Sequence, residues 1–311
     1  MSKSADIVAN ATTGVLPLIL DAMTNPVDGR WEMPWHRGNF MPINATTNRA
    51  YTGVMNPLLL GIKALEFGGD NRWAGFGQWR DSKNPVRKGQ TGTPILFAKQ
   101  ACAECGAYVF YNQKKCKRGH ALDKREAVRF VGWGSSKVFN NQQTVTPLAT
   151  IEIPDVDASV GFEKAASLIA NLDADLRHGG GRAYYSPRED YIGMPEAGSF
   201  HTVADYWATN LHEHAHWTGH ASRVGRKGIT RPSGYSNADY AFEELVAELT
   251  SAFMCHHLGI RREGLIDNHA KYLASWKQRL TEEPEALQRA ASQAGTAMRF
   301  LLEHGEGKGS K

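Results

Sequence analysis

The sequence predicts an α+β protein with a mixed α/β first half and a mostly helical second half. Residues 31 to 97 are rich in Gly, Pro, Asn and Trp and contain short strand-like runs such as Thr93–Ala98. Residues 127–139 also have the composition of strands, with a glycine turn between them. After residue 160, apolar residues recur every three or four positions over long stretches, which is typical of amphipathic helices.

These patterns divide the chain into two expected domains. The first covers residues 1–145, with an insertion at about 100–122, and a proline-bearing linker follows at 146–160. The second covers 161–304 and ends in a flexible tail at 305–311. Within the second domain the pattern predicts two short strands, at 183–185 and 190–194. It also predicts five helices, at 161–176, 202–218, 239–258, 267–280 and 284–303.

Composition places the chain among soluble globular proteins, with 41% hydrophobic and 22% charged residues in 311. The apolar run Val15–Leu20 contains a proline and is too short for a signal sequence or a membrane span. We therefore expect a cytoplasmic protein with no membrane partner.

Charge is unevenly distributed along the chain. Residues 1–150 hold 19 Lys and Arg against 10 Asp and Glu, a net of +9, whereas residues 151–311 hold 17 against 22, a net of −5. A basic half joined to an acidic half favours a polyanion-binding module attached to something else. The alternative is ordinary solubilising charge.

The pattern H-E-x-x-H occurs at His212-Glu213-His214-Ala215-His216, in a segment expected to be helical. Residues four apart share one face of a helix, so His212 and His216 can bind one metal ion. Glu213 is then placed to take a proton from a bound water. A His-rich helix with solvated imidazoles is the competing interpretation.

A second helical run supplies the missing carboxylates. Glu244 and Glu248 lie four residues apart, so they share one face of the 239–258 segment. A catalytic zinc takes three protein ligands, which makes Glu244 the expected third ligand and Glu248 an acceptor that orients a ligand imidazole. The sequence therefore predicts a zinc hydrolase site of the thermolysin-like type, called gluzincin, although manganese or another divalent ion is also compatible with these ligands.

A different ligand set is also considered. Metzincins continue as H-E-x-x-H-x-x-G-x-x-H, and Gly219 fits that pattern, but Ser222 occupies the position of the third histidine. His220, at helical spacing from His216, remains a minor alternative ligand. Candidates for stabilising an oxyanion are Tyr235, Tyr240 and His256, among which the sequence does not choose.

Tryptophans and cations alternate in the basic half. Aromatic faces stack on unpaired bases and neighbouring cations hold phosphates, so this pattern suits single-stranded nucleic acid better than a duplex. Trp73, beside a Gly-rich turn, is the residue we most expect to be exposed, although a single tryptophan is more often a core residue. The candidate DNA contacts are Trp31, Trp35, Arg72, Trp73, Trp79, Arg80, Arg87 and Lys88.

A second metal pattern lies inside the expected insertion. Cys102, Cys105, Cys116 and His120 form two closely spaced pairs, each able to bind one side of an ion. Cysteines at this spacing in a cytosolic chain favour a structural Cys3His zinc site over disulfides. The alternative is a reduced surface loop. The insertion is thus expected to resemble a zinc ribbon.

Ordered motifs along nearly the whole chain resemble the ArdC-type antirestriction proteins. In the first half they are Pro34-Trp35, Asn44 with Tyr51-Thr52-Gly53, Arg72-Trp73 with Phe76-Gly77-Gln78, and Val86-Arg87-Lys88-Gly89. In the second half they are Tyr191 to Pro195, Phe200, His212 to His220, Tyr240-Ala241, Glu243 to Glu248, and Tyr272 to Trp276. The segment from Cys102 to His120 looks like an insertion relative to that family.

The resemblance implies an N-terminal single-stranded-DNA-binding domain and a C-terminal zincin-like metallopeptidase domain on a mobile element such as a conjugative plasmid. Its metal residues carry over to His212, His216 and Glu244, and its catalytic carboxylate to Glu213. It also implies protection of entering DNA from restriction. A DNA-bound host protein is the expected peptide substrate, because DNA on the basic domain would concentrate such proteins near the peptidase site.

Three functions are compatible with these features. The first is a DNA-tethered metallopeptidase, which the intact Glu213 favours. The second is a DNA-binding shield in which the zincin domain is only structural. The third is an accessory part of a primase or a protease for DNA–protein crosslinks, and the sequence holds no primase-type cluster of carboxylates.

Overall fold

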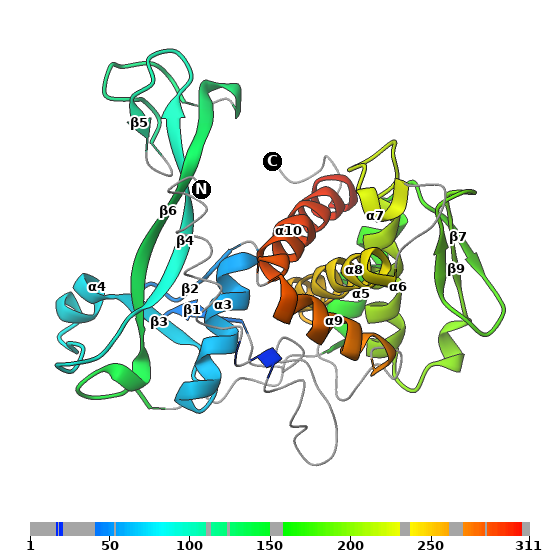
Figure 1. Ribbon diagram of the computed structural model, residues 1–311, viewed down its shortest axis with the longest axis horizontal. Helices are drawn as coiled ribbons and strands as arrows, with labels where there is room; N and C mark the ends of the chain where they lie inside the picture. The colour runs from blue at the N-terminus through cyan, green and yellow to red at the C-terminus, as the bar shows by residue number, and fades with distance from the viewer. Residues whose placement is uncertain are drawn as a thin grey trace.

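A long antiparallel pair of strands dominates the first half. Strands β4 (Thr93–Cys102) and β6 (Val128–Asn140) pair from Thr93 opposite Val138 to Cys102 opposite Val128. Figure 1 shows this pair, called here the arm, rising away from the rest of the molecule, with β5 near its tip. The structure is a computed structural model, which describes residues 17, 19–20, 41–52, 54–109, 113–122, 125–149, 158–230, 237–260, 270–283 and 285–306.

The arm belongs to a six-stranded sheet with the order β2-β1-β3-β6-β4-β5. The base of this sheet is covered by helix α3, whose Leu58, Leu59 and Ile62 are buried. The other elements of this half are β1 (Ile43–Asn44), β2 (Arg49–Ala50), α3 (Met55–Lys63), η2 (Ala64–Phe67), β3 (Arg72–Gly75), α4 (Phe76–Asp81), β5 (Tyr108–Val109), η3 (Arg125–Ala127) and η4 (Asn141–Gln143).

The glycine turn predicted within residues 127–139 is wrong, because Val128–Asn140 is one strand. Gly134 lies opposite Phe97 in the arm, and a Cβ atom there would be 2.5 Å from the Phe97 ring. The glycine therefore makes room for a cross-strand aromatic side chain instead of reversing the chain.

Helices form most of the second half, as predicted. The expected strands at 183–185 and 190–194 correspond to β8 and β9, with β9 in the middle of a sheet of order β7-β9-β8. The elements are α5 (Ala158–Ala170), β7 (Asp175–His178), β8 (Tyr184–Ser186), β9 (Tyr191–Met194), η5 (Ala197–Ser199), α6 (Val203–Thr218), α7 (Lys227–Thr230), α8 (Asn237–Leu258), α9 (Ala270–Glu282) and α10 (Ala286–Gly305).

The largest difference from a predicted helix boundary lies at the end of the first helix of this half. The helix expected over 161–176 ends at Ala170, and Asp175–His178 forms β7, which pairs in parallel with β9. A helical period alone does not report this pairing, because the partner strand lies further along the chain.

The two halves share one hydrophobic core. Leu58 and Ile62 of α3 belong to the same buried cluster as Leu249 and Phe253 of α8 and Leu287 of α10. Figure 1 shows α3 beside the α9–α10 side of the helical half. The arm's base is therefore packed directly against the helices. Among the described residues, no helix is long and apolar enough to span a membrane.

Candidate metal centre

Two long helices bring the H-E-x-x-H motif and the downstream carboxylates together. Thr202 caps α6, its Oγ1 accepting a hydrogen bond from the backbone N–H of Asp205 at 3.0 Å. Helix α8 packs against α6, and Ser251 Oγ donates to the Ala208 carbonyl across that contact at 2.7 Å. This packing places the 212–216 turn of α6 against residues 243–248 of α8.

Three potential ligand atoms converge at this contact. Nε2 of His212 lies 3.2 Å from Nε2 of His216 and 3.4 Å from Oε2 of Glu244. Nε2 of His216 lies 3.5 Å from Oε1 of the same carboxylate. A tetrahedral ion with ligands at its usual bond lengths separates neighbouring ligand atoms by about 3.3 Å. The spacing of the three side chains therefore fits one divalent ion.

The charge of the surroundings fits a cation as well. Burial alone would lower the pKa of His216, but hydrogen bonds to Glu243 and Glu244 outweigh burial and raise it to about 9. Burial would raise the pKa of Glu244, but His212 and His216 hold it well below its usual range. The site thus favours positive charge at the point between the three side chains, where a metal ion supplies it in place of protons.

Glu213 lies in the same turn of α6 and is also buried, with 7% of the residue exposed. Burial raises the pKa of its carboxyl group, and the backbone N–H of Tyr185 in β8 donates a hydrogen bond to it. A carboxylate with a raised pKa accepts a proton more readily than one in water.

Each ligand imidazole has a carboxylate beside its other ring nitrogen. Nδ1 of His212 lies 3.7 Å from Oε2 of Glu248, the position at which the sequence predicts an orienting acceptor. Nδ1 of His216 lies 3.3 Å from Oε1 of Glu243. Two ligand histidines need two such acceptors, so counting donors would have revealed the role of Glu243, to which the sequence analysis assigns none.

Arg226 holds Glu243 in place. Its guanidinium donates to both oxygens of Glu243, at 2.6 to 3.1 Å, and also to Thr218 Oγ1 and the Ala215 carbonyl at 2.6 Å. Although burial raises the pKa of Glu243, the charges and hydrogen bonds of Arg226 and His216 together outweigh burial and lower it. A Cβ atom on Gly228 would lie 2.9 Å from the Glu243 side chain, so the short helix α7 packs closely on this pair.

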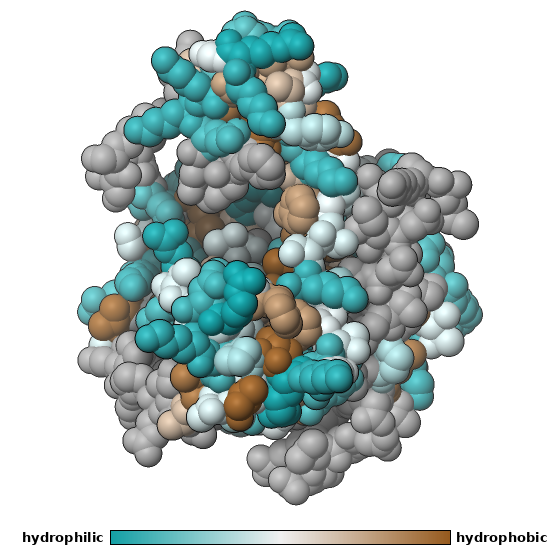
Figure 2. Space-filling view, turned by 90° about the vertical axis from the view of Figure 1, so that its left-hand side faces the viewer, coloured by the Kyte–Doolittle hydropathy of each residue, from teal (hydrophilic) through white to brown (hydrophobic). Residues whose placement is uncertain are grey.

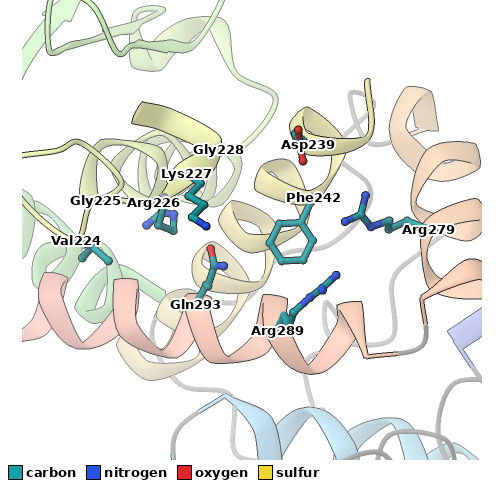
Figure 3. A pocket seen from close by; sticks show the side chains of 10 residues that line it. All are labelled: Val224, Gly225, Arg226, Lys227, Gly228, Asp239, Phe242, Arg279, Arg289 and Gln293. Carbon is teal, nitrogen blue, oxygen red and sulfur yellow. The ribbon is translucent and has the colours of Figure 1, made fainter. Parts of the chain in front are cut away.

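A cationic hollow of about 540 Å³ adjoins the other side of Arg226 (Figure 3). Figure 3 shows Phe242 of α8 near Arg279 and Arg289, with Lys227 directed toward Gln293. Among the residues described, the walls of this hollow do not include His212, His216 or Glu244. It therefore touches the metal centre only through Arg226 and its neighbours.

Among the described residues, no other histidine joins the cluster of three ligands. His220, the alternative ligand, has its Nδ1 2.8 Å from Ser222 Oγ. Nδ1 of His214 lies 2.9 Å from the Asn210 carbonyl oxygen. Tyr240 and His256 both belong to α8 and remain predictions as oxyanion stabilisers, whereas Tyr235 is outside the described residues.

The two described tryptophans of the expected DNA surface are core residues. Trp73, which we expected to be exposed, has 0% of its surface exposed and packs edge-on against Phe67. Trp79 is 1% exposed, and its Nε1 donates to the Phe139 carbonyl at 2.9 Å. The predicted exposure is wrong because α3 and η2 cover this face of β3, where Trp73 packs with Leu60 and Ala64.

The cations of that surface divide into two groups. Arg72 is buried, with an ion pair to Asp70 at 2.7 Å and hydrogen bonds to the Leu148 and Ala149 carbonyls. Arg87 donates to the Thr144 and Gln142 carbonyls. Both arginines hold the chain that follows the arm. Arg80 and Lys88 are exposed, as Arg87 also is, and Trp31 and Trp35 lie outside the described residues.

Comparison with known proteins identifies both halves. Residues 10–139 match the N-terminal domain of the anti-restriction factor ArdC, and residues 163–293 match a zincin-like metallopeptidase family. An uncharacterized protein, y4eC, of Sinorhizobium fredii (strain NBRC 101917 / NGR234) is 32% identical over 267 residues, which cover 85% of this chain and 82% of that protein. A DNA primase TraC of Escherichia coli is 33% identical over 282 residues, but the match spans only 25% of its length.

Solved structures agree with this assignment over nearly the whole chain. The Mn(II)-bound crystal structure of the antirestriction ArdC protein from the R388 plasmid has a TM-score of 0.68 and 27% identity, over 96% of this chain and 98% of that one. The metal-free structure has a TM-score of 0.66 and 26% identity, over 95% and 97%. Together with the two matched domains and the convergent His, His and Glu ligands, these likenesses show that the chain belongs to the family of ArdC-type antirestriction proteins.

Proposed function

We propose that this protein is a DNA-tethered metallopeptidase that protects incoming DNA from restriction. The observation that carries the proposal is the buried convergence of His212, His216 and Glu244 beside Glu213. A structural site needs no additional buried carboxylate next to its ligands, whereas hydrolysis of a peptide needs a general base there.

The three ligands would hold a zinc ion, or a manganese ion such as the one in the Mn(II)-bound relative. When bound, a divalent ion polarises a peptide carbonyl and acidifies a water molecule. Glu213 takes the proton of the attacking water and delivers it to the leaving amine. Glu243 and Glu248 keep the two imidazoles oriented by accepting from their Nδ1 atoms.

Strand β8 is the candidate guide for the substrate. It lies at one edge of its sheet, and Tyr185 in this strand reaches Glu213 through its backbone N–H. An extended peptide can add to an exposed strand edge by main-chain hydrogen bonds. A peptide bound along β8 would present its carbonyl close to the Glu213 carboxylate.

Exposed aromatic and basic side chains on the arm are the candidate DNA surface. Phe97, Tyr108 and Phe130 are 45%, 66% and 58% exposed. Lys99 and Arg129 are exposed on the same two strands. Rings that stack on bases beside cations that bind phosphates suit single-stranded DNA, which supports a DNA contact on the arm instead of at Trp73 and Trp79.

A non-proteolytic shield is the second candidate, because this arm surface could cover DNA without any contribution from the metal centre. Transfer of unmodified DNA into a restricting recipient separates the two functions. We expect Glu213→Gln to lose protection, while Glu163→Gln, at an exposed position of α5, keeps it. Full protection by Glu213→Gln, together with loss of protection in Phe97→Ala or Phe130→Ala, would establish the shield instead.

A further inference from the structure

The arm ends in a cluster of four side chains that the peptidase mechanism does not use. Cys102 closes β4, Cys105 lies in the turn before β5, and Cys116 and His120 lie in a second turn. Figure 1 places this tip at the end of the arm, away from α6 and α8, and Figure 2 shows mostly hydrophilic atoms over it.

The four potential ligand atoms have the spacing of a metal site. Sγ of Cys102 lies 3.5 Å from Nδ1 of His120, and Sγ of Cys105 lies 3.6 Å from Sγ of Cys116. All four atoms lie within 4.8 Å of one another. Tetrahedral zinc with its usual bond lengths separates two sulfur ligands by about 3.8 Å and a sulfur from a nitrogen by about 3.5 Å.

Two similar turns present these ligands. In the first, the backbone N–H of Gly106 donates to the Cys102 carbonyl at 2.9 Å, and in the second Gly119 donates to the Cys116 carbonyl at 2.9 Å. Both glycines have positive φ, +70° and +87°, which other residues rarely adopt. Each turn is thus built to fold the chain back sharply behind a cysteine.

Backbone N–H groups in both turns point at sulfur atoms. The N–H of Arg118 donates to Sγ of Cys116 at 3.3 Å, and the N–H groups of Glu104 and Cys105 donate to Sγ of Cys102. Such donors stabilise the negative charge of a thiolate, which is the form that binds a metal.

The carboxylate of Glu104 lies beside the second ring nitrogen of His120. Nδ1 of His120 faces Cys102, while its Nε2 lies 3.7 Å from Oε2 of Glu104. A histidine that binds a metal through one nitrogen usually donates its other N–H to such an acceptor. The arrangement repeats, at the tip, the pairing of His216 with Glu243 in the peptidase half.

Neither a disulfide nor a hydrophobic core accounts for this cluster. The four cysteines of the chain are free, and 3.6 Å between Cys105 and Cys116 sulfurs is well beyond a bonded distance of about 2.05 Å. The buried apolar cluster at the tip consists of Cys102, Val109 and Cys116, with Cys105, Leu122 and Val128 packed against it. So small a core does not order a segment of this length without a metal or a crosslink.

We propose that the tip is a structural zinc site formed by Cys102, Cys105, Cys116 and His120, separate from the metal centre between α6 and α8. Three thiolates and one imidazole favour zinc over manganese or magnesium, which prefer oxygen ligands. The ion folds the tip and so fixes the two turns that carry the exposed Lys114, Lys115, Lys117 and Arg118.

Cobalt substitution of the full-length wild-type protein tests the site directly. We expect Co²⁺ bound at the tip to give a strong near-ultraviolet band from thiolate-to-metal charge transfer and intense visible bands of a tetrahedral site. Cys116→Ser should lose the charge-transfer band, whereas Cys255→Ala, which removes the buried cysteine of α8, should keep it. His212→Ala should also keep it.

Zinc content gives an independent readout. The expected values are two ions per chain in wild type, one in Cys116→Ser, one in His212→Ala, and two in the conservative variant His120→Cys. Absence of the charge-transfer band in cobalt-loaded wild type would overturn the proposal even if Cys116→Ser failed to fold. A disulfide among Cys102, Cys105 and Cys116 in freshly purified protein would overturn it as well.

Discussion

The two clusters of metal ligands differ in how the chain brings their members together. At the tip of the arm, the ligands lie between Cys102 and His120 in two short turns, with little hydrophobic core around them. In the helical half, His212 and His216 meet Glu244 from another helix, inside a core that both helices share. Carboxylates lie beside the Nδ1 atoms of both histidines, from Glu248 and Glu243, and Arg226 donates to Glu243.

This difference assigns opposite roles to the two ions. Helices α6 and α8 position their ligands by packing, so the chain prepares that site before an ion arrives. At the tip, two turns contribute few apolar contacts, so the ion organises the chain. A preformed site suits catalysis, in which the ligand geometry must be maintained, whereas the tip needs its ion in order to fold.

The largest expected effect is a loss of structural order at the tip of the arm. In Cys116→Ser, backbone amides of residues 102–109 and 113–122 should lose protection from hydrogen exchange, because their segment then lacks both a core and a metal. In His212→Ala, amides of α6 and α8 should keep most of their protection, since packing holds these helices. Equal loss of protection in both regions would contradict the proposed division of roles.

Removal of the Glu243 carboxylate should lower the metal affinity of the preformed site without unfolding it. Glu243→Gln keeps a side chain of the same size but loses the charged acceptor for His216 and the partner of Arg226. We expect metal affinity to fall by roughly 10- to 100-fold. Competition with a chelator of known affinity measures this change.

Glu163→Gln, at an exposed position on α5, is the matched control and should bind metal as wild type does. If Glu243→Gln lowered the melting temperature but left metal affinity unchanged, Glu243 would be a structural residue and not one that positions His216.

DNA binding should respond to the arm and not to the helical site. Phe97→Ala or Phe130→Ala should weaken binding of a single-stranded oligonucleotide by roughly 5- to 150-fold, the value of one base stacked on one ring. Val203→Ala, at an apolar position of α6 that is 56% exposed, is the control. Fluorescence anisotropy at two salt concentrations measures both; unchanged affinity in the two arm variants would place the DNA surface elsewhere.

The smallest effect concerns a network at the base of the arm that uses no metal. Asp70 accepts hydrogen bonds from Arg72, Asn141 and Gln142. Although burial raises the pKa of Asp70, these bonds outweigh burial and lower it to about 2. Asp70→Asn should lower the free energy of unfolding by about 1–2 kcal/mol at neutral pH, after allowance for solvent screening of a partly exposed pair.

The sign of the pH dependence follows from this lowered pKa. The contribution of Asp70 is fully present above the pKa of an unfolded aspartate, about 4, and is lost as the pH falls through about 2. Denaturant unfolding between pH 7 and pH 2.5 should therefore show wild type and Asp70→Asn converging at the acid end. A constant difference at all pH values would contradict a charged Asp70.

The sequence could predict the features that depend on spacing along the chain. The four-residue spacings of His212 with His216 and of Glu244 with Glu248 define helix faces, so the ligand set follows once the two helices meet. The short spacings of Cys102 with Cys105 and of Cys116 with His120 likewise place each pair close together. In both cases the spacing of residues close in sequence determines which ligands lie together.

What the sequence could not predict depends on tertiary pairing. Trp73 and Trp79 look like a DNA-stacking pair beside arginines, but both rings are buried by tertiary packing. Trp73 packs with Leu60 and Ala64, and Trp79 of α4 packs with Ala74 and Phe139. Arg72 and Arg87 are directed at backbone carbonyls of the chain after the arm, which no local pattern reports. The contact of Arg226 with Glu243 likewise joins residues from different elements, and no local pattern reports it.

Cleavage of a DNA-bound protein by purified wild type and Glu213→Gln tests the central claim most directly. The assay uses a single-stranded-DNA-binding protein on DNA as the substrate and measures metal content in the same samples. We predict cleavage fragments with wild type, a rate lower by roughly 10²- to 10⁴-fold in Glu213→Gln, and equal metal content in the two. Equal rates in the two proteins at equal metal content would contradict a peptidase that uses Glu213 as its base.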